Sequence, residues 1–201
     1  MKYSIREIAS ILGVDDTRLV YGNDEVSYLL TDSRSLTYPE ATLFFAIKTK
    51  NNDGHRYVCH LHSLGVRNFV VEHTDGLPAD ANYLQVDNVV EALQRLAAYH
   101  RSRFHIPVIA ITGSCGKTTV KEWLYQLLSP DYNVVRSPRS FNSQIGVPLS
   151  LWDIDDNTRI AIIEAGISRP GEMAALSRII NPTYGIFTML GDEHGENFAS
   201  I

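Results

Sequence analysis

Hydrophobic residues follow two spacings along the first half of the chain, one typical of helices and one typical of strands. A helical pattern follows Ser4, where Ser4 and Glu7 match a capping box and Gly13 ends the pattern. Short apolar runs bounded by turn residues then predict strands at 26–31, 42–47, 68–72 and 83–86.

Two further helices are predicted between and after these strands. One begins at the Asp53-Gly54 turn and ends at Gly65, and a longer one takes Asp87 as its cap and ends near Arg103. This alternation of strands and helices is complete before the second half of the chain begins. We therefore expect residues 1–104 to form a small α/β domain.

The second half repeats the order of strand followed by helix. An apolar, β-branched run at 108–111 predicts a buried parallel strand, and the helix after it has apolar residues at helical spacing, namely Val120, Trp123, Leu124, Leu127 and Leu128. Further strands are predicted at 134–135, 160–164 and 184–189, with a helix at about 171–179. We expect residues 105–201 to form a parallel sheet covered by helices, although this sheet has few strands.

A phosphate-loop pattern lies between the strand at 108–111 and its helix. Glycines at 113 and 116 let the backbone approach an anion, and the N–H groups of the following helix point at it. Lys117 would reach the β- and γ-phosphates, and the Thr118 hydroxyl would bind Mg²⁺. The general motif has another glycine where this chain has Ile111, so the loop is a shorter G-x-x-G-K-T. The pattern predicts nucleotide binding.

Two titratable residues follow predicted strands, at the sheet edge where ligands of parallel sheets bind. Glu164 ends an apolar strand and could hold Mg²⁺ directly or through water, but an unliganded glutamate at a strand end is an equal alternative. His194 lies in a loop beyond the last predicted strand, and a lone loop histidine is more often structural than functional. The pattern alone leaves both alternatives open.

Composition and charge exclude several classes of protein. The formal net charge is −5 and there is no basic cluster, so we expect no nucleic-acid partner. Two cysteines give no disulfide framework. The N-terminus lacks the apolar segment of a signal peptide, and no apolar run of about 18 residues occurs, so we expect a cytoplasmic protein without a membrane partner.

Several motifs together indicate a family. The loop at 112–119, TGSCGKTT, resembles the T-G-[ST]-x-G-K-[ST]-[ST] signature of the Mur ligases and their folylpolyglutamate synthase relatives. The segments SFNSQIGVPL at 140–149 and IEAG…PGEM within 163–173 resemble two further motifs of these ligases. Upstream, TDSR, LFFA and DGH resemble elements of the family's UDP-binding first domain.

The loop and the FN motif are most similar to the branch of this family that builds a peptidoglycan precursor. The resemblance implies that ATP phosphorylates the terminal carboxylate of UDP-N-acetylmuramoyl-tripeptide. The amine of D-alanyl-D-alanine then attacks this acyl phosphate, giving an amide, ADP and phosphate. ATP and Mg²⁺ are the implied cofactors of this ligase.

The resemblance also implies roles for individual residues. It implies nucleotide contacts by Gly113, Ser114, Cys115, Gly116, Lys117, Thr118, Thr119 and Asn142. It implies metal binding by Thr118, Glu164 and His194, the last two forming the catalytic set with Lys117. The implied uridine-nucleotide pocket contains Ser33, Arg34, Asn51, Asn52 and Asp53.

Two parts of the family pattern lie outside this sequence. The family also uses a carbamylated lysine beyond the histidine and a C-terminal domain that binds the amino substrate. The chain is therefore expected to contain the first domain and the opening half of the ATPase domain, and to be inactive without its C-terminal domains. Two alternatives stay open: an amide ligase that is MurE-like or folylpolyglutamate synthase-like, and a non-catalytic nucleotide-binding module.

Overall fold

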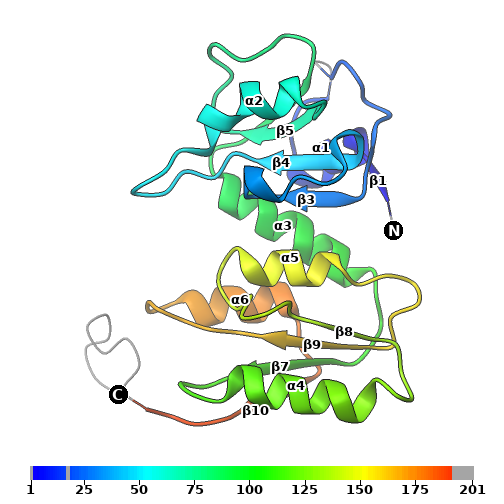
Figure 1. Ribbon diagram of the computed structural model, residues 1–201, viewed down its shortest axis with the longest axis vertical. Coiled ribbons are helices and arrows are strands. Elements are labelled where there is room, and N and C mark those ends of the chain that lie inside the picture. The colour runs from blue at the N-terminus through cyan, green and yellow to red at the C-terminus, as the bar shows by residue number, and fades with distance from the viewer. Residues whose placement is uncertain (1, 17–18, 192–201) are drawn as a thin grey trace. The chain divides into compact units, whose positions relative to one another are not determined.

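The computed structural model describes residues 2–16 and 19–191, and it divides into two compact units, Met1–Leu96 and Ala97–Ile201. Each unit contains a four-stranded parallel sheet with helices packed on it (Figure 1). The division lies inside helix α3 (Val89–Ser102). The predicted α/β class is confirmed. Within the described ranges, no helix is long and apolar enough to span a membrane.

The sheet of unit 1 has the strand order β3-β4-β5-β6. Its strands are β3 (Tyr28–Leu30), β4 (Thr42–Phe45), β5 (Asn68–Val71) and β6 (Asn82–Gln85). Helix α2 (Val58–Ser63) packs on one face, where Leu61 belongs to the same core cluster as Phe44 and Phe69. Leu43 and Phe45 alternate to the opposite face and are also buried, so both faces are covered, as is usual for a parallel sheet.

The N-terminal helix of unit 1, α1 (Ile5–Leu12), has the predicted capping box. Ser4 Oγ accepts a hydrogen bond from the Glu7 N–H at 3.2 Å, and Glu7 Oε2 accepts one from the Ser4 N–H at 2.7 Å. Gly13 ends the helix with a φ of 64°, a left-handed conformation that glycine adopts without a steric penalty.

Two sequence predictions for unit 1 are wrong in detail. The strand expected at 26–31 is divided into β2 (Glu25–Val26), which pairs with β1 (Tyr3–Ser4), and β3, which lies in the main sheet. Helix α3 is capped by Asn88 rather than by Asp87, because Asn88 Oδ1 accepts hydrogen bonds from the N–H groups of Val90 and Glu91.

The sheet of unit 2 has the strand order β10-β7-β9-β8. Its strands are β7 (Val108–Thr112), β8 (Val134–Arg136), β9 (Ile160–Glu164) and β10 (Tyr184–Phe187). Helix α4 (Lys117–Leu128) lies on one face, with α5 (Gly146–Trp152) and α6 (Glu172–Ile180) on the other (Figure 1). From β7 the chain crosses to β8 at one edge of the sheet. It then returns through β9 and reaches β10 on the other side of β7, so the direction of the connections reverses beside β7. Ligands of open α/β sheets bind at such a reversal, at the carboxyl ends of the strands.

Strand β9 directs one polar side chain, that of Glu164, toward helix α4. Ala161 and Ile163 belong to the core cluster on the side of α5 and α6. Because successive side chains of a strand point to opposite faces, Ile162 and Glu164 point toward α4. Glu164 is the last residue of β9 and is fully buried.

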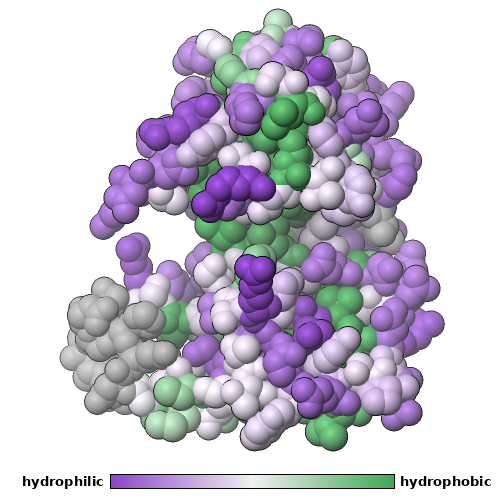
Figure 2. Space-filling model, in the orientation of Figure 1, coloured by the Kyte–Doolittle hydropathy of each residue, from purple (hydrophilic) through white to green (hydrophobic). Residues whose placement is uncertain are grey.

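Helix α4 forms where the apolar spacing predicts it, but the side chains that it buries are not the apolar ones of that spacing. Trp123 and Leu127 are 63% and 72% exposed, whereas the buried residue of the helix is Lys121. Tyr184 and Phe187 on the neighbouring edge strand β10 are also exposed. Figure 2 shows hydrophobic atoms at the surface along the bottom of the view, where Figure 1 places α4 and β10.

Candidate functional site

The loop between β7 and α4 has a shape that requires glycine at two positions. Gly113 has a φ of 130° and Gly116 a φ of 82°. A Cβ atom at Gly113 would lie 2.3 Å from Thr188 Oγ1 and 2.9 Å from the backbone nitrogen of Met189. Gly116 caps α4 without a side chain, so nothing of its own covers the first N–H groups of the helix.

The segment after β10 holds this loop in place. The Ser114 N–H donates to the Met189 carbonyl at 2.8 Å, and Ser114 Oγ accepts from the Gly191 N–H at 2.8 Å. Thr188 Oγ1 donates to the Cys115 carbonyl at 2.6 Å. The shape of the loop is therefore fixed by hydrogen bonds within the chain, so its N–H groups need little rearrangement to meet an anion.

Lys117 reaches back over the loop from the first turn of α4. Its Nζ donates to the carbonyls of Gly113 and Ser114, at 2.5 Å and 3.1 Å. A cation, a helix N-terminus and a glycine-rich backbone thus meet in one place, which is the arrangement that binds phosphate groups. Cys115 and Thr119 are exposed beside it.

Thr118 and Glu164 come from different elements and meet beside the loop. Thr118 Oγ1 donates to Glu164 Oε2 at 3.2 Å. Mg²⁺ prefers oxygen ligands about 2.1 Å away in octahedral geometry, which places neighbouring ligand oxygens about 3 Å apart. The type and the spacing of these two oxygens therefore fit Mg²⁺.

Lys121 is a residue of this site that the sequence analysis did not identify. Its fully buried Nζ lies 2.9 Å from Glu164 Oε1 and donates to the Ser137 carbonyl at 2.8 Å. It also donates to the Arg139 carbonyl and lies 3.3 Å from Glu122 Oε1. One sequence signal was present, because Lys121 follows Lys117 by four residues and so lies on the same face of the helix.

Asn142 lies beside the end of β9. Its carbonyl accepts a hydrogen bond from the Gly166 N–H at 2.8 Å, and a Cβ atom at Gly166 would lie 2.9 Å from Asn142 Cγ. The fold therefore brings Asn142 within two residues of Glu164 along the neighbouring backbone. His194, the other predicted metal ligand, lies outside the described residues.

The predicted uridine-nucleotide residues lie in two turns of unit 1. Ser33 and Arg34 lie in the turn η1 (Ser33–Ser35) after β3, and residues 51–53 lie in the turn after β4. Because β3 and β4 are parallel neighbours, both turns follow the carboxyl edge of the sheet. Arg34 binds Asp32 at 2.6 Å, and these hydrogen bonds from Arg34 lower the pKa of the Asp32 carboxyl to about 2.

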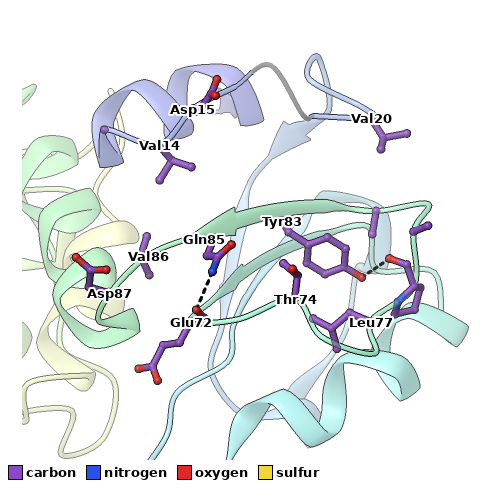
Figure 3. Close-up of a pocket in the computed structure, with 14 residues that line it drawn as sticks. Val14, Asp15, Val20, Glu72, Thr74, Leu77, Tyr83, Gln85, Val86 and Asp87 are labelled. Carbon is purple, nitrogen blue, oxygen red and sulfur yellow. Dashed lines mark hydrogen bonds between the residues drawn. The ribbon is translucent and has the colours of Figure 1, made fainter.

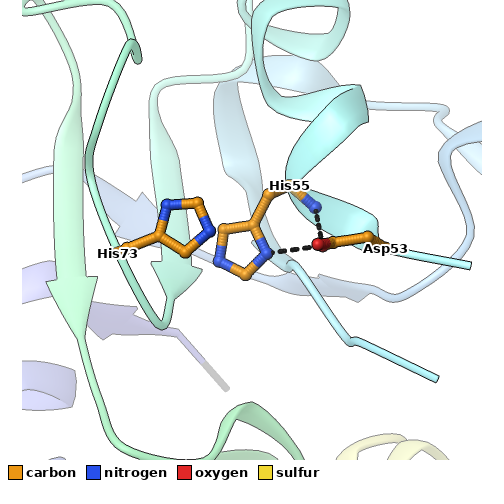
Figure 4. A group of neighbouring side chains, drawn as sticks. All are labelled: Asp53, His55 and His73. Carbon is orange, nitrogen blue, oxygen red and sulfur yellow. Dashed lines mark hydrogen bonds and ion pairs between the residues drawn. The ribbon is translucent and has the colours of Figure 1, made fainter. Parts of the chain in front are cut away.

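Asp53, His55 and His73 form a cluster next to the second of these turns (Figure 4). His55 Nε2 accepts from the Glu72 N–H at 2.9 Å, so the proton is on Nδ1, which lies 2.7 Å from Asp53 Oδ1. The hydrogen bond from the His55 backbone N–H is the main cause that lowers the pKa of Asp53. The His55 ring thus fastens the turn after β4 to the end of β5.

This cluster does not have the geometry of a metal centre. Both ring nitrogens of His55 are already hydrogen-bonded. The rings of His55 and His73 stack at 4.2 Å with 10° between their planes, so the lone pairs of the two rings lie in separate, nearly parallel planes and do not converge on one ion.

A hollow of about 920 Å³ lies in unit 1 beside the edge strand β6 (Figure 3). Its carboxylates are Asp15, Glu72 and Asp87, and none of its described lining residues is lysine or arginine. Tyr83 in its wall donates to the Pro78 carbonyl, and burial raises the pKa of Tyr83 to about 12. The hollow shares no residue with the predicted uridine pocket, and its charge does not suit a diphosphate.

Comparison with known proteins agrees with the geometry of the loop. Residues 111–201 match the model of the Mur ligase middle domain. The whole chain is 31% identical, over 201 residues, to the UDP-N-acetylmuramoyl-tripeptide–D-alanyl-D-alanine ligase of Bacillus subtilis (strain 168), of which it covers 44%. Residues 111–201 therefore match a Mur ligase middle domain, and the chain as a whole is similar to MurF ligases.

Solved structures show the same similarity. A crystal structure of MurF from Acinetobacter baumannii matches 98% of the chain with a TM-score of 0.86 and 27% identity, and the match covers 43% of that protein. MurF from Thermotoga maritima, solved in complex with ADP, matches 84% of the chain with a TM-score of 0.74 and 29% identity, over 39% of its length. The chain thus spans less than half the length of these relatives.

Proposed function

We propose that this chain carries the nucleotide site and the UDP-substrate site of a ligase that joins D-alanyl-D-alanine to UDP-N-acetylmuramoyl-tripeptide. The observation that carries the proposal is the phosphate loop with Thr118 and Glu164 paired beside it. The similarity to MurF ligases over the whole chain supports the choice of substrates.

The proposed reaction has two steps. In the first, the γ-phosphoryl group of ATP moves to the terminal carboxylate of the tripeptide, giving an acyl phosphate and ADP. In the second, the amine of D-alanyl-D-alanine attacks the acyl carbon, and the C–O bond to phosphate breaks. The amine loses a proton, so the products are an amide and inorganic phosphate.

The residues of unit 2 suit the first step, because phosphoryl transfer between two anions depends on positioning and neutralisation of charge. Lys117 and the first N–H groups of α4 would neutralise the β- and γ-phosphates. Thr118 and Glu164 would hold Mg²⁺, which spreads the negative charge of the phosphates when it is bound. Asn142, beside the end of β9, would contact the nucleotide, and His194 would complete the metal ligands.

We assign the UDP-substrate site to residues 1–104 and the nucleotide site to residues 105–201. Within the first domain, Ser33, Arg34 and residues 51–53 would bind the uridine nucleotide. Their two turns follow neighbouring parallel strands, β3 and β4, which supports a shared site at that edge.

Calorimetric titration of the chain with Mg²⁺–ADP tests the nucleotide site. Lys117→Ala should weaken ADP binding about 10- to 100-fold, because a charge-assisted hydrogen bond contributes about 1.5–3 kcal/mol. Arg178→Ala removes an exposed cation from α6 and should leave the affinity unchanged. Equal affinities for the wild-type chain and Lys117→Ala would refute the phosphate-loop assignment.

A second titration, with UDP-N-acetylmuramoyl-tripeptide, separates the ligase from a nucleotide-binding module. Saturable binding that UDP displaces is expected of the ligase. A folded chain that binds ADP but not the UDP-linked peptide would instead be a nucleotide-binding module or a different amide ligase.

A further inference from the structure

Lys121 is a buried cation that the proposed reaction does not use. Its side chain is fully buried, and its Nζ has four partners, namely the carboxylates of Glu164 and Glu122 and the carbonyls of Ser137 and Arg139. Burying a charge costs several kcal/mol unless it is paired, and an apolar residue in the same space is often as stable or more so. Packing alone therefore gives no reason for a lysine at this position.

The ion pair with Lys121 divides the two oxygens of Glu164 between two tasks. Glu164 Oε1 lies 2.9 Å from Lys121 Nζ, while Oε2 accepts from Thr118 Oγ1 at 3.2 Å. The Glu164 N–H in turn donates to Ser137 Oγ at 3.1 Å. The carboxylate is thus held at both oxygens, with Oε2 on the side of the phosphate loop.

The same ammonium group fixes the turn after β8. It donates to the carbonyls of Ser137 and Arg139, and Arg139 has a φ of 49°, a left-handed conformation that is unfavourable for a residue with a side chain. Such a conformation persists where contacts with surrounding residues hold it in place, and the hydrogen bonds from Lys121 are among these contacts. This turn leads directly into the FN segment that contains Asn142.

We infer that Lys121 is a positioning residue, which rests on the function proposed above. It holds Glu164 by Oε1 so that the other oxygen, Oε2, is presented to the metal–nucleotide complex. It acts through Glu164 and touches neither the nucleotide nor the reacting atoms.

The test measures metal affinity without turnover. Binding of Mn²⁺ to the complex of the chain with ADP is followed by electron paramagnetic resonance, and metal-free ADP binding is measured in the presence of a chelator. Lys121→Met should weaken Mn²⁺ binding about 10-fold or more and leave metal-free ADP binding within about twofold of the wild type. Glu164→Gln should show the same selective loss. The double variant Lys121→Met/Glu164→Gln should lose no more than Glu164→Gln alone, because both changes act on one interaction.

Two further variants separate positioning from folding. Arg101→Met also removes a buried cation of unit 2, but the partners of Arg101 are the carbonyls of Phe104, Ile180 and Asn181. It should lower the melting temperature and keep wild-type Mn²⁺ affinity. Lys121→Gln removes the charge but keeps N–H donors, on a side chain one bond shorter, for the carbonyls of the β8 turn, so it decides the question if Lys121→Met does not fold.

The outcomes distinguish this inference from the proposed function. Wild-type Mn²⁺ affinity in folded Lys121→Met or Lys121→Gln overturns the role of Lys121 and leaves the proposed function intact. A wild-type chain that binds no Mn²⁺–ADP overturns both. Selective loss of Mn²⁺ affinity in the Lys121 variants, with normal affinity in Arg101→Met, supports the positioning role.

Discussion

The two units use the same plan of parallel strands and covering helices, but they differ in how polar residues are arranged at the strand ends. In unit 2, a residue from α4 binds a residue from β9, and the turn after β8 joins them through Lys121. In unit 1, the turn after β3 is closed on itself, as Asp32 holds Arg34 two residues away, and the turn after β4 is joined to the end of β5 through the single ring of His55. Contacts between distant elements fix a site before a ligand arrives, whereas local contacts fix only the turn that contains them.

Substitution of glycine in each unit should give the largest effect and separate the two designs. Gly113→Ala forces a Cβ atom against Thr188 and Met189, and we expect ADP affinity to fall about 100-fold or more, from about 3 kcal/mol of lost binding energy. Gly54→Ala should instead destabilise unit 1, because its Cβ would lie 2.6 Å from the backbone of Ala46. Gly185→Ala, whose Cβ has nothing within 4 Å, is the control. ADP titration and circular dichroism of all three variants check these expectations.

Acid should destabilise unit 2 before unit 1. Burial lowers the pKa of His100 in α3 from 6.5 to about 4, so the unfolded chain takes up a proton that the folded unit does not. The stabilisation is complete above pH 6.5 and is lost as the pH falls toward 4, by up to about 3 kcal/mol. In unit 1, the Asp32 carboxyl has a pKa lowered from 3.8 to about 2, so its contribution is lost only at lower pH.

Urea denaturation from pH 7 to pH 4 measures this loss. His100→Gln should flatten the pH dependence in that range, and His105→Gln, which changes an exposed histidine, should leave it as in the wild type. An unaltered slope in His100→Gln would contradict the assignment.

Loss of the His55 ring should have a smaller effect, confined to unit 1. His55→Ala leaves the buried end of β5 without an acceptor for the Glu72 N–H and frees Asp53, so unit 1 should lose about 1–3 kcal/mol of stability. ADP affinity, which we assign to unit 2, should stay the same. His73→Ala removes the exposed ring of the stack and should cost less, and both are measured by urea denaturation.

Arg34→Gln should have the smallest effect on stability. The Arg34 side chain is 87% exposed, and an ion pair in solvent contributes little to stability. Although its stability is nearly unchanged, the variant should bind UDP-N-acetylmuramoyl-tripeptide more weakly than the wild type does in calorimetric titration. If the affinity is unchanged, Arg34 serves only to hold Asp32, and unit 1 binds its ligand elsewhere.

The sequence predicted the elements of both units well, because buried parallel strands and capped helices leave strong local patterns. The glycine turn at 113–116, between a strand and a helix, was predicted correctly for the same reason, since its glycines and Lys117 are close together in the chain. The cap at Asn88 was missed by one residue because Asp87 and Asn88 are both good caps, and only the path of the backbone selects between them.

Lys121 was missed for a different reason. On a helical pattern it counts as a polar position that should face water, and only the fold shows that α4 turns this position toward β9. The apolar residues Trp123 and Leu127 on the same helix are exposed, so their spacing predicted the helix but not its buried face. Partners supplied by distant strands cannot be read from local spacing.

The positions of the tryptophans make the two units distinguishable by spectroscopy. The chain has two tryptophans, the exposed Trp123 and the buried Trp152, and both belong to unit 2. Indole emission therefore reports the unfolding of unit 2 alone, while unit 1 contributes only tyrosine emission and backbone dichroism. Iodide should quench the emission of Trp123 far more than that of Trp152, so one sample gives separate signals for the surface and the core of unit 2.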